Sequence, residues 1–468
     1  MISPAHREPP DDGNRRASMF FAATHSSFRL PRLRNQFHAR LAGGVFWSVA
    51  GAVTSRGLTL LAAMCAARLL GAERFGQLAI VQATSAAVAV LAGLGLGLTV
   101  TNYVARYRDA AKQRAGRVIG LALLCSAVAG AIMGVIVCAL ASRLSRDVLQ
   151  APALADALVI SGALLVLSAV AGTQAGALAG LEAFRRVATL NAIRAVFSAG
   201  FLIAGAWFRG VVGAIFGLAL AEAAGVVVGQ AVLARESSRR GIQIAWTPTR
   251  GELANVLKFS LPALLSSVAV APVLWLTRVW LVRGPDGYLQ AGLYDAAQKW
   301  VLVILFLPSA IVPVQIPMLA NLDSAGLHAD HRVALRAGVV LITIVCLVVA
   351  VPVVVMAPYL MRGFGESFAH GRVLAIAGIG ALPIAMNAAL GQSLVTTGRI
   401  WWRFAYDSLL AALLLGAAWY LIPAFAAEGL ALSSVLAYTL TSMAVALHLR
   451  SSSRRRSSNS ISPNPAPT

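Results

Sequence analysis

The chain has 468 residues, of which 58% are apolar and only 12% are charged, and its mean hydropathy is +0.76. Soluble domains are about 45–50% apolar and about a quarter charged, so too few polar side chains remain here to cover one water-soluble core. This composition excludes a large soluble α-protein and predicts a polytopic membrane protein. The net charge of +21 favours basic cytoplasmic loops over a nucleic-acid partner.

Both ends of the chain are polar and basic, and we expect them to be disordered cytoplasmic tails. Residues 1–40 hold seven arginines, and no short apolar core with a small-residue cleavage site follows them, as a secretory signal peptide would require. Residues 449–468 end in a stretch rich in Ser, Arg and Pro.

Twelve apolar segments lie between the tails, six on each side of a polar linker at 235–252. The expected domains are therefore an N-terminal bundle, 41–234, and a C-terminal bundle, 253–448. The predicted fold class is all-α, with twelve transmembrane helices in two six-helix bundles around a central cavity. The segments are 42–67, 77–100, 117–140, 154–177, 188–207, 211–234, 253–281, 290–316, 333–357, 370–396, 404–422 and 427–448.

The distribution of charge predicts the orientation. If both termini are cytoplasmic, 27 of the 39 Lys and Arg residues fall on the cytoplasmic side and nine on the opposite side. Arg403 is among the 27, in the loop before the eleventh segment. This bias predicts that both termini and the linker are cytoplasmic, and it favours an even number of helices.

The two halves carry related loops. RLLGAERFGQLAI at 68–80 matches RGPDGYLQAGLYDA at 283–296, and GALAGLEAFRR at 176–186 matches LVTTGRIWWRF at 394–404. The offset is 214–218 residues in both cases. Because each half has an even number of helices, both enter the membrane from the same side, which predicts a parallel repeat about an axis along the membrane normal.

Prolines gather in the second half. Proline either bends a helix or marks its end, and both interpretations remain open for helices seven to ten. The prolines of the second half's membrane part are Pro262, Pro272, Pro308, Pro313, Pro317, Pro352, Pro358 and Pro383.

Five ionisable residues inside the apolar segments are the candidate site residues, because charge inside a bilayer is costly. The cations Arg56, Lys299 and Arg278 are the candidate substrate-binding residues. The carboxylates Asp295 and Glu222 are candidates for ion coupling or ion pairing. Asp295 and Lys299 are four residues apart and so share a helix face, which leaves a structural ion pair and a functional pair both open. No Cys or His spacing predicts a metal or cofactor site.

No catalytic residue is expected. The sequence has no G-x-x-x-x-G-K-[ST] phosphate-binding loop and no long external loop with paired carboxylates for sugar transfer. A secondary transporter or flippase is therefore favoured. One alternative is an ion-coupled multidrug or small-molecule exporter, which should keep acidic groups deep in the bundle. A second is a membrane-embedded glycan polymerase or ligase, which would need catalytic groups on an external loop.

Four segments together resemble the polysaccharide-export flippases of the multidrug/oligosaccharidyl-lipid/polysaccharide (MOP) exporter superfamily. They are ARLLGAERFGQLAI, GLGLTVTNYVARYR, ALAGLEAFRRVATLNAIRA and GLYDAAQKWVLVILFLPSAIVPVQIPMLANL, and the resemblance covers about 41–448. It implies alternating-access flipping of an undecaprenyl-diphosphate-linked oligosaccharide, such as an O-antigen or exopolysaccharide repeat unit, across the bacterial inner membrane. It also implies cationic cavity residues, contact with membrane lipids and a glycan polymerase as a candidate partner. The chain has fewer segments than lipid II flippases usually have, which makes a peptidoglycan precursor a less suitable substrate.

Overall fold

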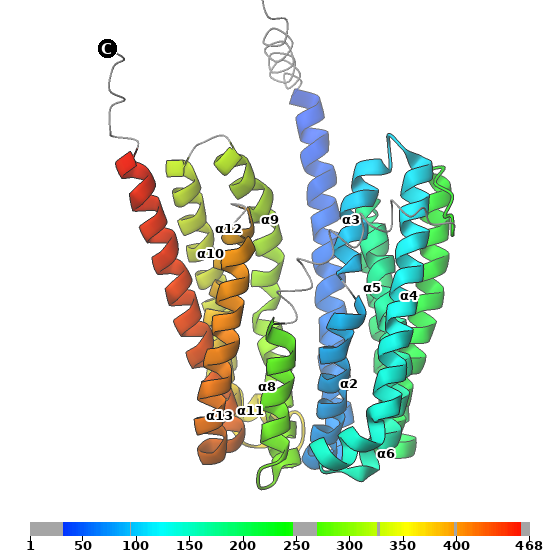
Figure 1. Cartoon of the computed structure of the whole chain (residues 1–468), viewed down its shortest axis with the longest axis vertical. Coiled ribbons are helices and arrows are strands. Elements are labelled where there is room, and N and C mark those ends of the chain that lie inside the picture. Colours follow the sequence, from blue (N-terminus) through cyan, green and yellow to red (C-terminus); the bar gives the residue numbers. More distant parts are fainter. Residues whose placement is uncertain (1–30, 94, 247–268, 325–327, 397–399, 460–468) are drawn as a thin grey trace, which may run out of the picture. The chain divides into compact units, whose positions relative to one another are not determined.

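The computed structural model describes residues 31–459, except 94, 247–268, 325–327 and 397–399 (Figure 1). The described residues divide into two compact units at residue 50, and the contacts below all lie in the second unit. The described residues form helices joined by short turns, with no β-strand among them. The expected all-α membrane fold is confirmed.

The helices of the first half begin in the expected tail, and the last of them continues into the expected linker, to Arg239. The longest is α2, which begins at Pro31, well before the first apolar segment. Their bounds are α2 Pro31–Gly93, α3 Leu96–Tyr107, α4 Lys112–Arg143, a π-turn Leu144–Val148, a 3-10 turn Pro152–Leu154, α5 Ala155–Gly180 and α6 Phe184–Arg239.

The first described helical stretch of the second half is Ala269–Val282. The last helix extends past the expected end of the bundle into the polar C-terminal residues. The remaining bounds are α8 Gly287–Ile304, α9 Phe306–Ser324, α10 His328–Val355, α11 Ala357–Arg362, a 3-10 turn Glu366–Phe368, α12 Gly371–Thr396 and α13 Ile400–Asn459. Residues 1–30 and 460–468 of the expected tails lie outside the described residues.

Seven described helical stretches are long and apolar enough to cross a membrane, or eight if the bent α8–α9 pair is one span. Three of the long stretches are interrupted by non-helical residues, at Gly71 in α2, at Arg209–Gly210 in α6 and at Ala426 in α13. Divided at these points, the described helices are consistent with the twelve expected segments. Part of the seventh segment, 253–268, lies outside the described residues.

Two of the interruptions are tight hairpins held by glycine. Within α6, a Cβ on Gly217 would overlap the backbone oxygen of Phe201, and Gly205 lies equally close to Gly213. Within α13, Gly429 approaches the backbone of Leu421 in the same way. Residues on either side of each break therefore pack backbone against backbone, which small residues permit between helices in lipid.

The bend between α8 and α9 follows from a proline. The axes of α8 and the first part of α9 differ by 47°. Pro308 lies in the first turn of α9 and has no N–H to donate to the carbonyl of Ile304, so the helix breaks between them. Pro352 and Pro383, by contrast, lie inside the continuous helices α10 and α12. Pro308 thus lies at a helix break, whereas Pro352 and Pro383 interrupt neither of their helices.

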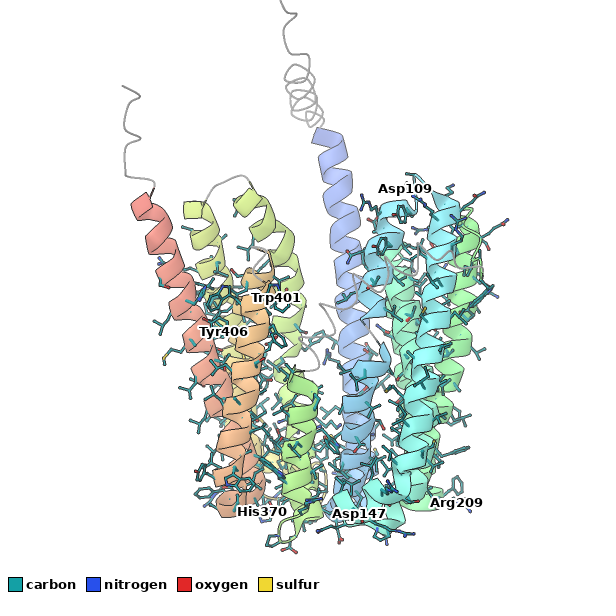
Figure 2. All side chains as sticks on the ribbon, viewed as in Figure 1. Asp109, Asp147, Arg209, His370, Trp401 and Tyr406 are labelled. Carbon is teal, nitrogen blue, oxygen red and sulfur yellow. The ribbon has the colours of Figure 1, made fainter. Side chains whose placement is uncertain are left out.

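Aromatic side chains mark the two ends of the membrane-spanning part. Trp401 and Trp402 are exposed at the start of α13, and Trp419 and Tyr420 are exposed near its break. Eighteen residues of helix separate the two groups, about 27 Å at 1.5 Å per residue, close to the ~30 Å of the hydrocarbon core. Such aromatic belts are typical of both membrane interfaces. Figure 2 shows Asp147, Arg209 and His370 at one end of the helices and Asp109 at the other.

Candidate substrate site along helices α8 and α9

Arg56, from the first helix, lies over an aromatic ring at the bend between α8 and α9. Its guanidinium carbon is 5.4 Å from the centroid of the Phe306 ring, within the range of a cation–π contact. The Arg56 side chain is exposed. Because an aromatic face attracts a cation without neutralising it, Arg56 keeps its full charge for an anionic ligand.

Lys299 and Asp295 form the ion pair that their spacing predicts. Lys299 Nζ lies 3.0 Å from Asp295 Oδ2, and the side chains are 22% and 13% exposed. Both residues are on α8, one turn apart. The pair is therefore partly shielded but still open to a ligand on one side. The next residue, Trp300, has a buried indole N–H with no partner among the described residues, so this part of the helix also offers an unused donor.

Arg278 contacts the same helix from the stretch that precedes it. Its guanidinium carbon is 5.8 Å from the centroid of the Tyr294 ring. Tyr294 is buried and directly precedes Asp295. Among the described residues, neither Arg278 nor Arg56 forms an ion pair with a carboxylate.

The three predicted cations therefore all meet the α8–α9 segment. At 100° per residue, Asp295, Lys299 and Phe306 project from one face of the segment, within about 40° of each other before the bend is considered. Tyr294 and Phe306 are separated by twelve residues, or about 18 Å of helix rise. We refer to Arg278, Lys299 and Arg56 with this segment as the cation ladder.

The fifth candidate, Glu222, does not belong to this group. It interacts electrostatically with Arg194, and both lie within α6. Arg194 Nη2 donates to Gln174 Oε1 at 3.1 Å, and Gln174 is fully buried. The side chain of Arg194 also packs over Gly225. Arg194 and Glu222 thus form an internal polar cluster of the first half, separate from Asp295.

A second buried ion pair was not predicted from the sequence. Arg403 Nε donates to Asp407 Oδ2 at 2.8 Å, and Asp407 is 5% exposed. The expectation that Arg403 lies in a cytoplasmic loop was wrong, because α13 begins at Ile400 and includes it. Its guanidinium lies against Gly391 of α12. The signal was present as an Arg–Asp pair four residues apart, the same spacing as in Asp295 and Lys299.

The loop ends of the first half are held by ion pairs. Arg108, just after α3, donates to the carboxylate of Glu182 at 2.7 Å. The hydrogen bond that Arg108 donates to Glu182 is the main cause that raises the pKa of the Arg108 guanidinium above its usual value. Arg240 bonds to Glu236 at 3.0 Å and also donates to the backbone oxygen of Leu181. These cations belong to the structure of the loop ends and not to the cation ladder.

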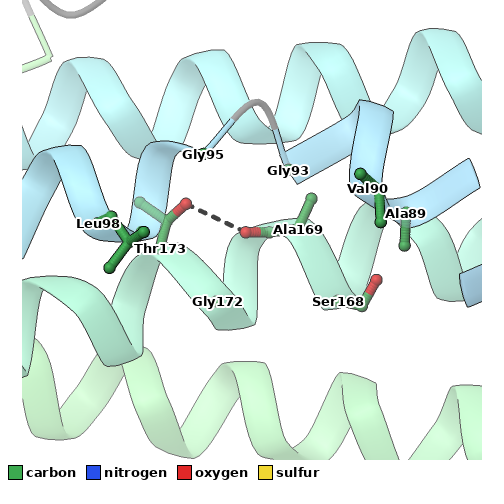
Figure 3. Close-up of a pocket in the computed structure, with 10 residues that line it drawn as sticks. Ala89, Val90, Gly93, Gly95, Leu98, Ser168, Ala169, Gly172 and Thr173 are labelled. Carbon is green, nitrogen blue, oxygen red and sulfur yellow. Dashed lines mark hydrogen bonds between the residues drawn. The ribbon is translucent and has the colours of Figure 1, made fainter. Parts of the chain in front are cut away.

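A cavity of about 390 Å³ lies elsewhere, where α2 ends and α3 begins beside α5 (Figure 3). Glycine and small apolar residues form most of its wall. Its two hydroxyl groups are already bonded to their own helix, Thr173 to the oxygen of Ala169 and Ser168 to that of Leu165. This cavity therefore presents no free charge to an anionic group. Among the described residues, no cluster of His, Cys, Asp or Glu could hold a metal ion.

A family model described as "Polysaccharide biosynthesis protein" matches residues 41–323, more than half of the chain. The chain belongs to this family. The family match begins before Arg56 and includes all three members of the cation ladder.

Two curated relatives carry the same name. EPS I polysaccharide export inner membrane protein EpsE of Ralstonia nicotianae is 25% identical over 421 residues, which is 86% of this chain and 92% of the relative. The protein of that name from Ralstonia solanacearum is 28% identical over 226 residues, 47% of this chain and 50% of the relative.

Solved structures show the same fold at low sequence identity. An inward-facing multidrug resistance MATE family transporter of the MOP superfamily has a TM-score of 0.69 at 14% identity, covering 86% of this chain and 98% of the other. The lipid II flippase MurJ in an inward closed conformation has a TM-score of 0.68 at 12% identity, covering 87% of each chain. An outward-facing MATE structure scores 0.61 at 15% identity, covering 87% and 96%. The chain therefore shares the fold of known members of the MOP superfamily.

Proposed function

We propose that this protein flips an undecaprenyl-diphosphate-linked oligosaccharide, an O-antigen or exopolysaccharide repeat unit, across the bacterial inner membrane by alternating access. The observation that carries the proposal is the cation ladder, in which Arg278, Lys299 and Arg56 meet one bent helix. A diphosphate cannot enter hydrocarbon without compensation, and guanidinium groups bind phosphate oxygens in a bidentate manner. Arg56 and Arg278 suit this role because their described contacts are aromatic faces.

The relatives support the same substrate class. Both are named polysaccharide export inner membrane proteins, and a structural neighbour is named a lipid II flippase. In the proposal, residues 41–234 and 253–448 act as two bundles that enclose the head group in turn from each side. The lipid tail stays in the bilayer. A glycan polymerase on the external side would consume the flipped repeat unit.

The test is a flipping assay in proteoliposomes. Purified protein is reconstituted with a fluorescent lipid-linked oligosaccharide, and the fraction of sugar cleaved by an external, membrane-impermeant glycosidase is followed in time. We expect protein-dependent conversion from about half of the lipid to nearly all of it, and loss of this conversion when the ladder cations are neutralised. Arg209→Ala, which removes an exposed arginine at a helix end, is the matched control.

The same preparation discriminates the exporter alternative. An ion-coupled drug exporter would accumulate a cationic dye in the proteoliposomes under an ion gradient and leave the lipid unflipped. Dye transport without lipid flipping would overturn the proposal. The described cations of the ladder outnumber its one carboxylate, Asp295, which favours an anionic substrate over a cationic one.

A further inference from the structure

Two arginines reach between the halves at the end of the helices that holds Asp147. We call residues 51–246 and 269–459 the N-terminal and C-terminal halves. Arg283 of the C-terminal half donates from Nε to the oxygen of Val148 at 2.9 Å and from Nη2 to that of Asp147 at 2.8 Å. Arg68 of the N-terminal half donates from Nε to the oxygen of Gly363 at 2.9 Å.

The accepting oxygens lie at helix ends. Asp147 and Val148 end the π-turn that follows α4, and Gly363 follows the last residue of α11. Terminal carbonyls of a helix have no partner within it and carry the negative end of the helix dipole. A guanidinium is therefore a favourable cap. Each half supplies the cation that caps a helix end of the other half.

The two caps correspond to each other in the internal repeat. Arg68 and Arg283 differ by 215 positions, and Asp147 and Gly363 by 216, inside the 214–218 offset of the matched loops. The two contacts are therefore two copies of one contact, related by the approximate two-fold axis between the halves.

A close crossing of helices accompanies these caps. A Cβ on Gly76 of α2 would overlap the backbone oxygen of Tyr288 and lie 2.8 Å from the nitrogen of Gly292. A Cβ on Gly292 of α8 would overlap the oxygen of Ala72 and lie 3.2 Å from the nitrogen of Gly76. Both pairs, 76 with 292 and 72 with 288, are 216 residues apart, so the crossing has the symmetry of the caps.

Each cap is supported by a different neighbour. On the Arg68 side, the Phe75 ring packs against those of Phe364 and Phe368, with centroids 6.2 and 5.8 Å apart, and all three are buried. On the Arg283 side, the hydroxyl of Tyr288 donates to the oxygen of Leu149 at 2.5 Å. The Arg68 cap is thus flanked by buried aromatic rings, and the Arg283 cap by a further hydrogen bond to the neighbouring residue Leu149.

We propose that Arg68 and Arg283 are a pair of latches that hold this end of the transporter closed, and that both release when the halves separate here. This inference rests on the proposed alternating-access function because it requires the two halves to separate at this end. It does not depend on which substrate is transported. The latches bind backbone oxygens, so release leaves no unpaired carboxylate, and water can solvate both the guanidinium and the carbonyl groups. Such a contact can be broken and remade in every cycle.

The test measures a distance between the halves in the full-length protein. Ser142 and Ser367 are exposed serines, one in each half near the latched end, and Ser→Cys at both allows spin labelling. Cys65, Cys125, Cys138 and Cys346, the four native cysteines, are first replaced by Ser, and flipping activity is verified. Pulsed electron–electron double resonance then gives the distribution of distances between the two spin labels in lipid nanodiscs.

We expect one short distance population in the parent protein and a second, longer one in Arg68→Ala/Arg283→Ala. Loss of one charged hydrogen bond shifts an equilibrium by roughly tenfold or more, so each single variant should show a smaller long population than the double variant. Arg209→Ala should match the parent. An unchanged distribution in the double variant overturns the latch, and so does a long population of equal size in Arg209→Ala.

Lysine variants keep the proposal testable if the double alanine variant does not fold. A lysine side chain has a single donor nitrogen. Arg283 donates from two nitrogens and Arg68 from one. We therefore expect Arg283→Lys to increase the long population more than Arg68→Lys does. Equal or reversed effects would overturn the proposal. Loss of flipping with no change in distance would also overturn the latch while leaving the flippase function intact.

Discussion

Gly76 and Gly292 touch through their backbones where α2 crosses α8, and neither position has room for a Cβ. The backbone oxygen of Tyr288 occupies the place where a Cβ on Gly76 would lie, and the backbone oxygen of Ala72 occupies the corresponding place at Gly292. Oxygens fixed in helix backbones cannot move aside as a flexible side chain can, so the two helices must separate if either glycine is enlarged.

Gly292→Val should therefore hold the two halves apart at this crossing and impair transport. Overpacking of a close contact costs about 1–3 kcal/mol, which corresponds to a loss of the closed state by a factor of roughly 5 to 150. We expect surface polysaccharide to fall strongly at near-normal protein level. Gly416→Ala, at a position with no heavy atom within 4 Å of the added Cβ, should transport normally, and a normal Gly292→Val would refute the close contact.

Arg56→Ala should abolish glycan export while leaving protein level near normal. The Arg56 side chain is exposed over Phe306, so its removal leaves no buried polar group unpaired. Arg56→Lys should retain part of the activity, because the charge remains while the bidentate geometry is lost. The measurement is the amount of surface glycan restored when each variant is expressed in a strain that lacks the gene, with the protein level followed by immunoblotting. Normal export by Arg56→Ala would remove this residue from the substrate site.

Lys299→Ala should impair flipping more than Asp295→Ala does. The two side chains form one pair at 3.0 Å, but only Lys299 can also bind an anion. Breaking a buried pair costs about 3–5 kcal/mol, and the partial exposure of this pair places it at the lower end. The double neutral variant should recover expression without recovering flipping.

An alternative role for Asp295 has a different result. If Asp295 is a proton or sodium site, as carboxylates within membranes often are, Asp295→Asn should lose ion dependence and keep substrate binding. Proteoliposome flipping with and without a proton or sodium gradient separates the two roles. Normal flipping by Lys299→Ala would reduce the pair to a packing contact.

Asp407→Ala should destabilise the protein by about 3 kcal/mol, because it leaves the guanidinium of Arg403 without its carboxylate in a buried position. The measurement is thermal unfolding of purified protein in detergent. Asp109 also pairs with Arg108, at 3.3 Å, and its side chain is 87% exposed. Asp109→Ala leaves Arg108 paired with Glu182 and should change stability by less than about 0.5 kcal/mol. Equal shifts for the two variants would contradict the buried character of the Arg403–Asp407 pair.

Reporter fusions after residue 242 and after residue 450 should both report a cytoplasmic location. The reason is the excess of 27 over nine cationic residues on the expected cytoplasmic side. An alkaline phosphatase fusion is active only in the periplasm, whereas a green fluorescent protein fusion fluoresces only in the cytoplasm. We therefore expect fluorescence and no phosphatase activity at both positions. Phosphatase activity at either position would reverse or break the predicted topology.

Apolar length predicted the all-helical membrane fold, because a spanning helix needs a minimum number of apolar residues. The described helices are consistent with the twelve predicted segments. The pairing of Asp295 with Lys299 was also predictable, since residues four apart on a helix always share a face. Helix ends were less predictable: Arg403 was placed in a loop because a charge count does not show how far a helix continues into polar sequence.

Contacts between distant segments could not be read from spacing at all. Arg56 and Phe306 are 250 residues apart, and nothing in either local sequence indicates that they meet. The same holds for Arg194 and the buried Gln174. These partners depend on how helices pack, and packing in lipid follows from small residues and interhelical hydrogen bonds whose partners a single sequence does not reveal.

The reciprocal capping by Arg68 and Arg283 has a consequence for how such a chain can arise. In a two-fold symmetric dimer, one surface patch meets its own copy, so a single residue makes the same contact twice. A six-helix ancestor with one arginine and one glycine at these positions would form both caps and the helix crossing by pairing with itself. Once two copies are fused, each side can change independently, as the aromatic cluster around Phe75 and the hydroxyl of Tyr288 illustrate.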